Sequence, residues 1–330
     1  MLGRAMADWN AVRFDPSKSA DHVESYFLKL NEPGGLRALW LKATILAGAG
    51  RQPVAEAWSI AFDREAGHVA GKAVVPFGEA SFSRTGLDVR VAGIEIGAGR
   101  SRGQITQGSD RIEWDLEFDA SGEPMVHYPS PSMYQGPLPS QKVVTPYPDT
   151  VFSGSYRVNG RAVSVTNWRG MQGHNWGKRH TELYAWGHVN QWENAEDLVL
   201  EGATGRLKLG PILAPPLTMV CVWNAGKKYQ FNDVRNLLRN TGVLTTRSWR
   251  FEAENAEARV HGELAADTDE MVGLHYENPN GEMTYCLNSK IAWALLVLEP
   301  KSGPRVQATS NAAALEIGTK DPKHGVCMLA

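Results

Sequence analysis

The chain has 330 residues, enough for two domains of ordinary size or for one large all-β unit with a sizeable core. Its 34 basic and 36 acidic residues give a net charge of -2, which excludes the basic surface expected of a nucleic-acid-binding protein. The three cysteines are scattered and odd in number, so they indicate a reducing compartment rather than a disulfide framework.

The N-terminal segment lacks the continuous apolar core of a signal peptide, and no run of about 18 apolar residues occurs anywhere in the chain. We therefore expect a soluble, cytoplasmic protein with no integral membrane segment. Transient contact with a membrane, to collect a substrate, stays open. Nothing in the sequence indicates an oligomeric state.

Short apolar runs that alternate with period two, separated by glycine, proline and Asn/Asp-rich turns, predict strands through most of the chain. The clearest is "RIEWDLEF", residues 111–118, with four apolar side chains on one face and four charged ones on the other. Only "DVRNLLRN", residues 233–240, favours a helix. The predicted fold class is all-β: two lipocalin-like antiparallel barrels or sandwiches packed together, with little helix.

Two early strands place a carboxylate within an apolar row. Glu24 is in step with Tyr26 and two leucines in "ESYFLKL", and Glu56 is in step with Trp58 in "PVAEAWSIAFDR". Complete burial raises a carboxyl pKa by up to about 3–5 units, which makes the neutral acid a proton donor near pH 7. Glu56 is the first choice for that role, and Glu201, in "DLVLE", is a third carboxylate of the same kind. The alternative is that Glu56 pairs with a basic residue or lies at a sheet edge.

The stretch from His127 to Thr150 contains six prolines, which cannot donate to a sheet ladder and occur at edges or in connections. It predicts a boundary between an N-terminal domain, residues 1–140, and a C-terminal domain, residues 141–330. The second would carry the "GHNWG" motif.

The segment 167–194 holds four of the eleven tryptophans and three of the nine histidines. On a strand, "ELYAWGHVNQW" turns its small apolar residues to one side and an aromatic and polar set to the other. That set, expected to line a cavity inside a barrel, is Tyr184, Trp186, His188, Asn190 and Trp192. The alternative is that the rings fill the barrel and that His188 and Asn190 bond to backbone groups.

Just upstream, three glycines surround His174 and Trp176 in "GMQGHNWGKRH", which permits unusual backbone conformations or a close approach of chain or ligand. A metal site built from His174, His180 and His188 is disfavoured, because intervals of six and eight residues match no zinc signature. We expect no metal and no cofactor. The sequence also lacks a GxSxG elbow, a P-loop, a dinucleotide fingerprint and HExxH.

The segments "WRGMQGHNWG" and "YAWGHVNQW", with "ESYFLKLNEPGGLRALWLKATIL", "EAWSIAFDR" and "GLHYENPNGEMTYCLNSKIA", resemble the lipocalin-like superfamily. This superfamily includes carotenoid 1,2-hydratases (hydroxyneurosporene synthases), tocopherol cyclases and AttH-type proteins. The resemblance implies two lipocalin-like β-domains with a ligand pocket. It also implies cofactor-free chemistry on isoprenoids, in which a protonated carbon–carbon double bond is captured by water or an internal hydroxyl.

The sequence thus predicts a protein that binds a hydrophobic small molecule, terpenoid or polyketide-like, and hydrates or cyclises it by acid catalysis. The proton would come from Glu56, His174 or His188. The indoles of Trp168, Trp176, Trp186 and Trp192 would face the cation, since each aromatic face attracts a desolvated cation by roughly 2 kcal/mol. The hydratases are expected to use an aspartate near the tryptophan-rich strand, whereas the nearby acids here are at turns. A carrier without catalysis and a purely structural role are the alternatives.

Overall fold

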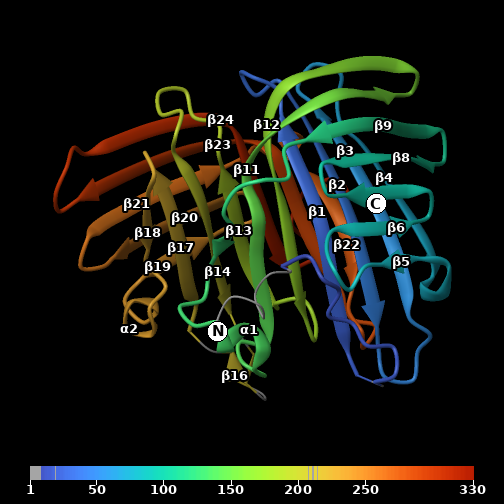
Figure 1. Cartoon of the computed structure of the whole chain (residues 1–330), viewed down its shortest axis with the longest axis horizontal. Helices are drawn as coiled ribbons and strands as arrows, with labels where there is room; N and C mark the ends of the chain where they lie inside the picture. The colour runs from blue at the N-terminus through green and yellow to red at the C-terminus, as the bar shows by residue number, and fades with distance from the viewer. Residues whose placement is uncertain (1–8, 19, 207, 210–211, 214) are drawn as a thin grey trace.

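The structure is a computed structural model that describes residues 9–18, 20–206, 208–209, 212–213 and 215–330. Antiparallel strands dominate these residues and form two large sheets and one small hairpin (Figure 1). The predicted all-β class is confirmed. No helix among the described residues is long and apolar enough to cross a membrane.

The first sheet has twelve strands in the order β4-β3-β2-β1-β12-β11-β9-β8-β7-β6-β5, with β10 paired to β11. The strands are β1 (His22–Asn31), β2 (Arg37–Ala47), β3 (Val54–Asp63), β4 (Val69–Pro76), β5 (Ser81–Phe82), β6 (Asp88–Val91), β7 (Ile94–Gly97), β8 (Arg100–Gln107), β9 (Asp110–Phe118), β10 (Met125–Val126), β11 (Gln141–Val158) and β12 (Arg161–Gly177).

The second sheet has ten strands in the order β18-β17-β14-β13-β24-β23-β21-β20-β19, with β22 paired to β23. The strands are β13 (Leu183–Val189), β14 (Val199–Arg206), β17 (Leu217–Asn224), β18 (Lys227–Gln230), β19 (Thr241–Leu244), β20 (Ser248–Glu254), β21 (Ala258–Ala265), β22 (Val272–Glu277), β23 (Met283–Pro300) and β24 (Val306–Thr319). The small hairpin joins β15 (Lys208–Leu209) to β16 (Ile212–Leu213).

Helical structure within the described residues is limited to single turns: α1 (Ser132–Gln135), α2 (Val234–Leu237), η1 (Phe77–Glu79) and η2 (Thr268–Glu270). The helix predicted over residues 233–240 is therefore present but covers only α2. Asp233 precedes it without a side-chain capping bond, which is consistent with so short a helix.

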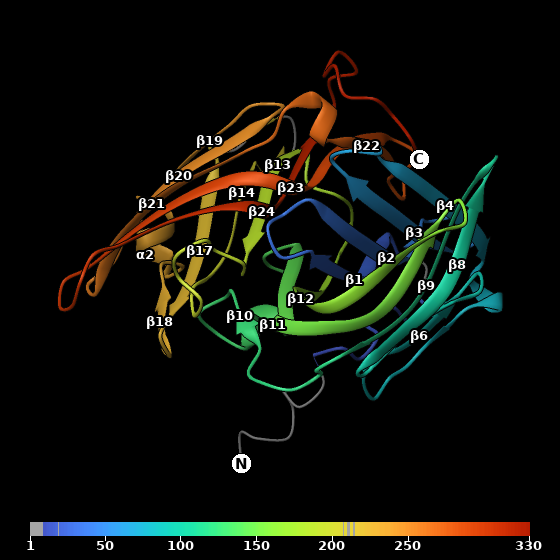
Figure 2. The same cartoon turned by 90° about the horizontal axis from the view of Figure 1, so that it is seen from above.

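The first sheet curls so that β4, at one end of the strand order, approaches β8 (Figure 2). The side-chain oxygen of Gln107 on β8 accepts a bond from the backbone N–H of Lys72 on β4, at 2.9 Å. The concave side encloses a core that includes Leu41, Trp114 and Trp168. On β9 the apolar side chains enter this core and the charged ones face solvent, as the alternation predicts.

Strands β1, β2 and β3 are buried on both faces, because one face lines the first core and the other meets the second sheet. Figure 2 shows these strands opposite β13, β22 and β23. Two apolar clusters join the sheets. One contains Trp40, Trp58 and Leu274, and the other contains Phe27 and Trp186. Side chains that alternate away from the first core are therefore buried in an interface rather than exposed to water.

The chain passes from the first sheet to the second between Gly177 and Leu183. The division between sheets thus lies later than residue 140, where the proline-rich segment predicts a domain boundary. Residues 141–177 form β11 and β12, which complete the first sheet, and the "GHNWG" motif ends β12. Two prolines of β11, Pro146 and Pro148, lie at bulges in its pairing with β12.

Candidate active site between the two sheets

The aromatic face predicted on β13 lies between the two sheets rather than inside either core. Trp186 packs with Phe27 and Met171 of the first sheet, and its ring centroid lies 5.7 Å from that of Phe27 in an edge-to-face arrangement. The opposite face of β13 carries Ala185 and Val189 into the core of the second sheet. Small residues are needed there, since a side chain at Gly187 would overlap Leu264.

Trp186, His188 and Asn190 share this interface, and Tyr184 is half-buried beside them. The Asn190 amide donates to Gly170 O at 2.7 Å and to Asp149 Oδ1 at 2.9 Å, so it ties the second sheet to the first. Trp192 lies elsewhere, in the core of the second sheet. It follows the end of β13, where the strict alternation of side chains stops.

Glu201 forms the centre of a buried acid–base cluster. It lies opposite His188 in the β13–β14 ladder and is fully buried. Its carboxylate accepts hydrogen bonds from Thr145 Oγ1 at 2.6 Å and Trp186 Nε1 at 3.0 Å, and His127 Nε2 lies 3.3 Å from Oε2. The cluster draws on both sheets, since Thr145 belongs to β11 and the loop containing His127 follows β10.

Glu201 and His127 stabilise each other in the charged form. Burial by itself lowers the pKa of an imidazole, but the attraction of Glu201 overrides it and raises the pKa of His127 to about 10. Burial likewise opposes ionisation of Glu201, yet His127 and the hydrogen bonds lower its pKa to about 2. At neutral pH the pair is therefore an imidazolium beside a carboxylate. Cys221 Sγ lies 3.7 Å from Nδ1 of His127.

His188 has the opposite character. Nε2 lies 2.8 Å from the carbonyl oxygen of Pro148, which only accepts, so Nε2 carries the proton. The other ring nitrogen, Nδ1, is buried with no hydrogen-bond partner among the described residues. Burial and the positive charge of Lys29 lower the pKa of His188 to about 3. His188 is therefore a neutral base with a free lone pair.

His174 lies on the other face of the first sheet. Its Nε2 is 2.9 Å from Glu24 Oε1, its Nδ1 is 2.6 Å from the carbonyl oxygen of Trp9, and its ring stacks on Tyr26 at 4.2 Å. Glu24 also accepts from the Tyr26 hydroxyl, from His22 and from two backbone N–H groups. Burial opposes ionisation of Glu24, but these bonds hold its pKa well below the usual range.

Glu56 is ion-paired. Its Oε1 lies 2.8 Å from Lys72 Nζ, and Trp58 Nε1 donates to its other oxygen at 3.3 Å. This is the arrangement given above as the alternative to a neutral acid. Glu56 lies at the rim of the inter-sheet face, next to Trp58, and not beside His188 or Glu201.

The remaining predicted tryptophans lie outside the inter-sheet cluster. Trp168 is in the first core, where its ring centroid is 5.9 Å from that of Tyr156. Trp176 packs near Tyr134, and the guanidinium of Arg13 lies 5.0 Å from its ring. The predicted site residues are therefore divided among the inter-sheet face, the two cores and the rim, and the interface brings only part of them together.

The glycines around His174 serve close packing. Gly170 and Gly173 have ordinary negative φ angles, but an added side chain would overlap the carbonyl of Lys29 or the ring of Phe27. At these two positions glycine permits a close approach of neighbouring atoms. The absence of side chains at these glycines lets β12 pair closely with β1 in the first sheet.

Five interface residues were missed from the sequence: His127, Thr145, Lys29, Lys42 and Lys290. His127 and Thr145 lie in the segment interpreted as a boundary. Two of the lysines carried a usable signal, because apolar residues flank Lys29 and Lys42 on both sides in the sequence, as they flank Glu56. No group of three or more metal-ligating side chains is arranged to hold an ion in the part of the chain that the structure describes.

A surface pocket of about 830 Å³ lies apart from this cluster, near α2. Most of its lining residues are of polar type, among them Lys228, Asn232 and Glu257. None of the predicted site residues contributes to it.

Two large antiparallel sheets packed face to face, one of them curled, with buried titratable groups between them, define an all-β protein of the lipocalin-like class. The chain belongs to the tocopherol cyclase-like family, whose model matches residues 81–319. The resemblance inferred from the sequence is thereby confirmed. No curated protein matches the sequence.

Three solved structures share the fold. A candidate AttH protein from Nitrosomonas europaea is 13% identical with a TM-score of 0.57, over 94% of this chain and 97% of the other. Kievitone hydratase from Nectria haematococca is 11% identical with a TM-score of 0.53, over 94% of each chain. CghA, crystallised with Sch210972, is 9% identical with a TM-score of 0.59, over 90% of this chain and 88% of the other. At these identities the likeness concerns the fold alone.

Proposed function

We propose that the protein binds a hydrophobic small molecule between its two sheets and hydrates or cyclises it by acid–base catalysis without a cofactor. The observation that carries the proposal is the contrast between two buried histidines near Glu201. His127 is held as an imidazolium, whereas His188 is neutral with a free nitrogen. Groups with pKa values displaced in opposite directions are typical of acid–base sites. The family and the hydratase among the structural neighbours support this reaction class.

In this proposal the Glu201–His127 pair supplies the proton. Its proton is held firmly, as the raised pKa of His127 indicates, so protonation of an isolated alkene would be strongly uphill. The reactive double bond should therefore be activated by conjugation or by an oxygen substituent. Conjugated isoprenoids meet that requirement, whereas the prenyl double bond of a prenylated phenol is isolated from the ring and would be the more demanding substrate.

The cation that forms would face Trp186, whose indole N–H is anchored by Glu201. An aromatic face attracts a desolvated cation by roughly 2 kcal/mol and does not trap it covalently. His188 then accepts the proton lost by the water or hydroxyl that captures the cation, through Nδ1. The sequence suggested His188 as an acid, but a pKa near 3 favours the role of base.

One observation favours a non-catalytic carrier as a second candidate. Every buried carboxylate among the described residues has a basic partner: Glu24 with His22 and His174, Glu56 with Lys72, Asp63 with Arg37 and Arg161, and Glu201 with His127. A carrier needs no proton donor facing its ligand. The two candidates therefore differ in turnover and not in binding.

Turnover can be tested by incubating the protein with prenylated phenols and conjugated isoprenoid alcohols in D₂O. Mass spectrometry then detects hydration as an added water, cyclisation as an isomer with a new retention time, and protonation as deuterium bound to carbon. We expect Glu201→Gln to reduce the rate by about 10²–10⁴-fold, the usual contribution of a general acid, with ligand binding retained.

Glu24→Gln is the matched control, because it makes the same change in the other buried carboxylate bonded to histidine. It should leave turnover within a few-fold of the parent. Loss of turnover in Glu24→Gln alone would move the site to His174. Binding without conversion of any compound would support the carrier.

A further inference from the structure

Three lysines are buried between the sheets: Lys29 on β1, Lys42 on β2 and Lys290 on β23, here called the lysine cluster. Lys29 and Lys290 are fully buried, and Lys42 is 6% exposed. Lysine is almost never fully buried without a partner, because removing an ammonium ion from water is costly. Three buried lysines in one interface, of which only Lys290 has a carboxylate partner, therefore require an explanation.

Two of the three lysines, Lys42 and Lys290, lie near the indole of Trp40. Lys290 Nζ lies 5.4 Å from the ring centroid of Trp40 and 5.3 Å from that of Trp186, so it stands between them. Lys42 Nζ lies 5.8 Å from the Trp40 ring and 3.9 Å from the ring of Tyr276. The two sheets thus bring their ammonium groups to a common aromatic surface.

Negative charge in this region does not balance the cluster. Lys290 is paired with Glu316 at 2.7 Å. Lys29 donates to the neutral amide of Asn190 at 3.0 Å, and no carboxylate among the described residues forms an ion pair with Lys29 or Lys42. The nearest other acids are already engaged, Glu56 with Lys72 and Asp149 with Arg169.

The neighbouring thiol and phenol groups cannot supply the missing negative charge. Burial and the nearby Glu316 raise the pKa of Cys286 to about 12, and burial raises the pKa values of Tyr184 and Tyr276 well above the usual range. All three stay neutral at physiological pH. The buried hydroxyl of Tyr276 and the buried indole N–H of Trp40 have no hydrogen-bond partner among the described residues.

An apolar surface adjoins these donors. Trp186, Phe27, Met171 and Ala314 form a continuous apolar group beside Lys290, and Trp186 retains 8% exposure. Tyr184 and Glu316 are half-buried at the edge of this group, where it reaches solvent. The combination suits a molecule with one charged end and a long apolar body.

We infer that the lysine cluster binds the anionic head group of an amphipathic substrate, a carboxylate being the simplest such group, while the apolar body lies against Trp186. The inference rests on the proposed function, because it names the substrate class of that site. A head group at Lys42 and Lys290 leaves the body of the substrate extending toward Trp186, and hence toward Glu201 and His188. This places the reacting carbons at a distance from the charged end.

The test compares acids with their own methyl esters, which differ mainly in charge. Farnesoic acid, dodecanoic acid and the two esters are titrated calorimetrically against the full chain at pH 7. We expect each acid to bind at least about tenfold more tightly than its ester, since hydrogen bonds to charged groups stabilise by about 1.5–3 kcal/mol. Lys42→Met should remove most of that preference while leaving affinity for the ester unchanged.

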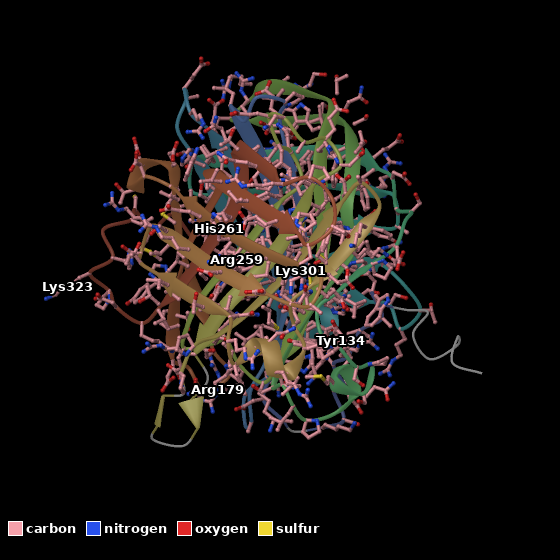
Figure 3. The ribbon with its side chains drawn as sticks, turned by 90° about the vertical axis from the view of Figure 1, so that its left-hand side faces the viewer. Tyr134, Arg179, Arg259, His261, Lys301 and Lys323 are labelled. Atoms are coloured by element: carbon pink, nitrogen blue, oxygen red, sulfur yellow. The ribbon has the colours of Figure 1, made fainter. Side chains whose placement is uncertain are left out.

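Lys301→Met is the control, because Lys301 is exposed in the turn between β23 and β24, on the side of the molecule that faces the viewer in Figure 3. Lys29→Met gives a second, independent variant. Neither buried substitution should lower thermal stability, since each replaces a buried amino group that no carboxylate pairs with by an apolar chain of similar length. Equal affinity for acid and ester, no affinity for either, or an unchanged preference in both buried variants would overturn the inference.

These results are separable from the test of turnover. Turnover of neutral phenols by a protein that shows no preference for acids would remove the inference and leave the proposed function intact. A preference for acids that depends on Lys42, without turnover of any compound, would support an anion-binding carrier.

Discussion

Lys29 should make the protein more stable as pH rises from about 7 to 10.5. This direction distinguishes Lys29 from a basic group whose charged form is stabilised by folding. Burial, and then the positive charge of Lys290, lower the pKa of Lys29 from 10.5 to about 7, against the opposing attraction of Asp149. Between these two values the unfolded lysine is protonated and the folded one is largely neutral. The unfolded chain thus binds more protons, so the contribution of Lys29 to the free energy of unfolding rises with pH across this range.

The magnitude follows from the displacement of the pKa. At roughly 1.4 kcal/mol per pKa unit, a change from 10.5 to about 7 destabilises the fold by at most about 5 kcal/mol. This destabilisation applies in full below pH 7, where Lys29 is protonated in the folded protein. His127 acts in the opposite sense. Its raised pKa stabilises the fold below about pH 6.5, and that stabilisation is lost as pH rises through about 10. The two groups oppose each other in the parent protein, so a single pH profile would conceal both.

Lys29→Met separates them. We expect the variant to be more stable than the parent below pH 7 by several kcal/mol. This gain is reduced by about 1 kcal/mol because the hydrogen bond to Asn190 is lost. The difference should shrink steadily toward pH 10. Urea unfolding at intervals of one pH unit measures it, with Lys301→Met as the exposed control. Parallel profiles for variant and parent would refute the reasoning.

Three further predictions concern other parts of the structure. Glu24→Gln removes an ionised acceptor from its buried histidine partners and should cost about 3–5 kcal/mol at pH 7. Because the pKa of Glu24 is depressed, that cost should diminish as pH falls below about 4.5, which acid titration followed by circular dichroism would reveal. Gly173→Ala drives a methyl group into the ring of Phe27 and should lower stability by about 1–3 kcal/mol in a thermal melt, whereas an unchanged melting temperature would contradict the close packing. Cys327 is exposed and the other two cysteines are buried, so a thiol reagent should titrate one group in the native protein and three in denaturant.

The alternation of side chains was sufficient to predict the strands. The apolar rows of β3, β9 and β14 all appear, and the small and aromatic faces of β13 separate as expected as far as Asn190. Alternation cannot say what a face meets, however. The aromatic face of β13 suited the inside of a barrel as well as the interface that it occupies, because both are buried and partly polar.

The sequence could not identify the ion-pair partners of the buried carboxylates, because alternation does not say which distant residues a face meets. Glu56 could be recognised as a buried carboxylate, but its partner Lys72 is fixed by the register of β3 with β4. Glu201 was the third of three candidate carboxylates, after Glu56, and only the approach of His127 from a distant loop distinguishes it. A segment rich in proline reads as a connection, and the fold uses this connection to carry a histidine into the interface.

The two inter-sheet histidines show how one buried region can hold an acid and a base together. Both rings are removed from water, which alone would make both neutral. His127 retains its proton because the carboxylate of Glu201 lies 3.3 Å from it. The ammonium of Lys29, in contrast, adds to the effect of burial on His188 and lowers its pKa further. Removal of the Lys29 charge should therefore raise the pKa of His188 and leave His127 nearly unchanged, which histidine-selective NMR titration of Lys29→Met would resolve. If both resonances moved together, the division of roles would not depend on the lysine cluster.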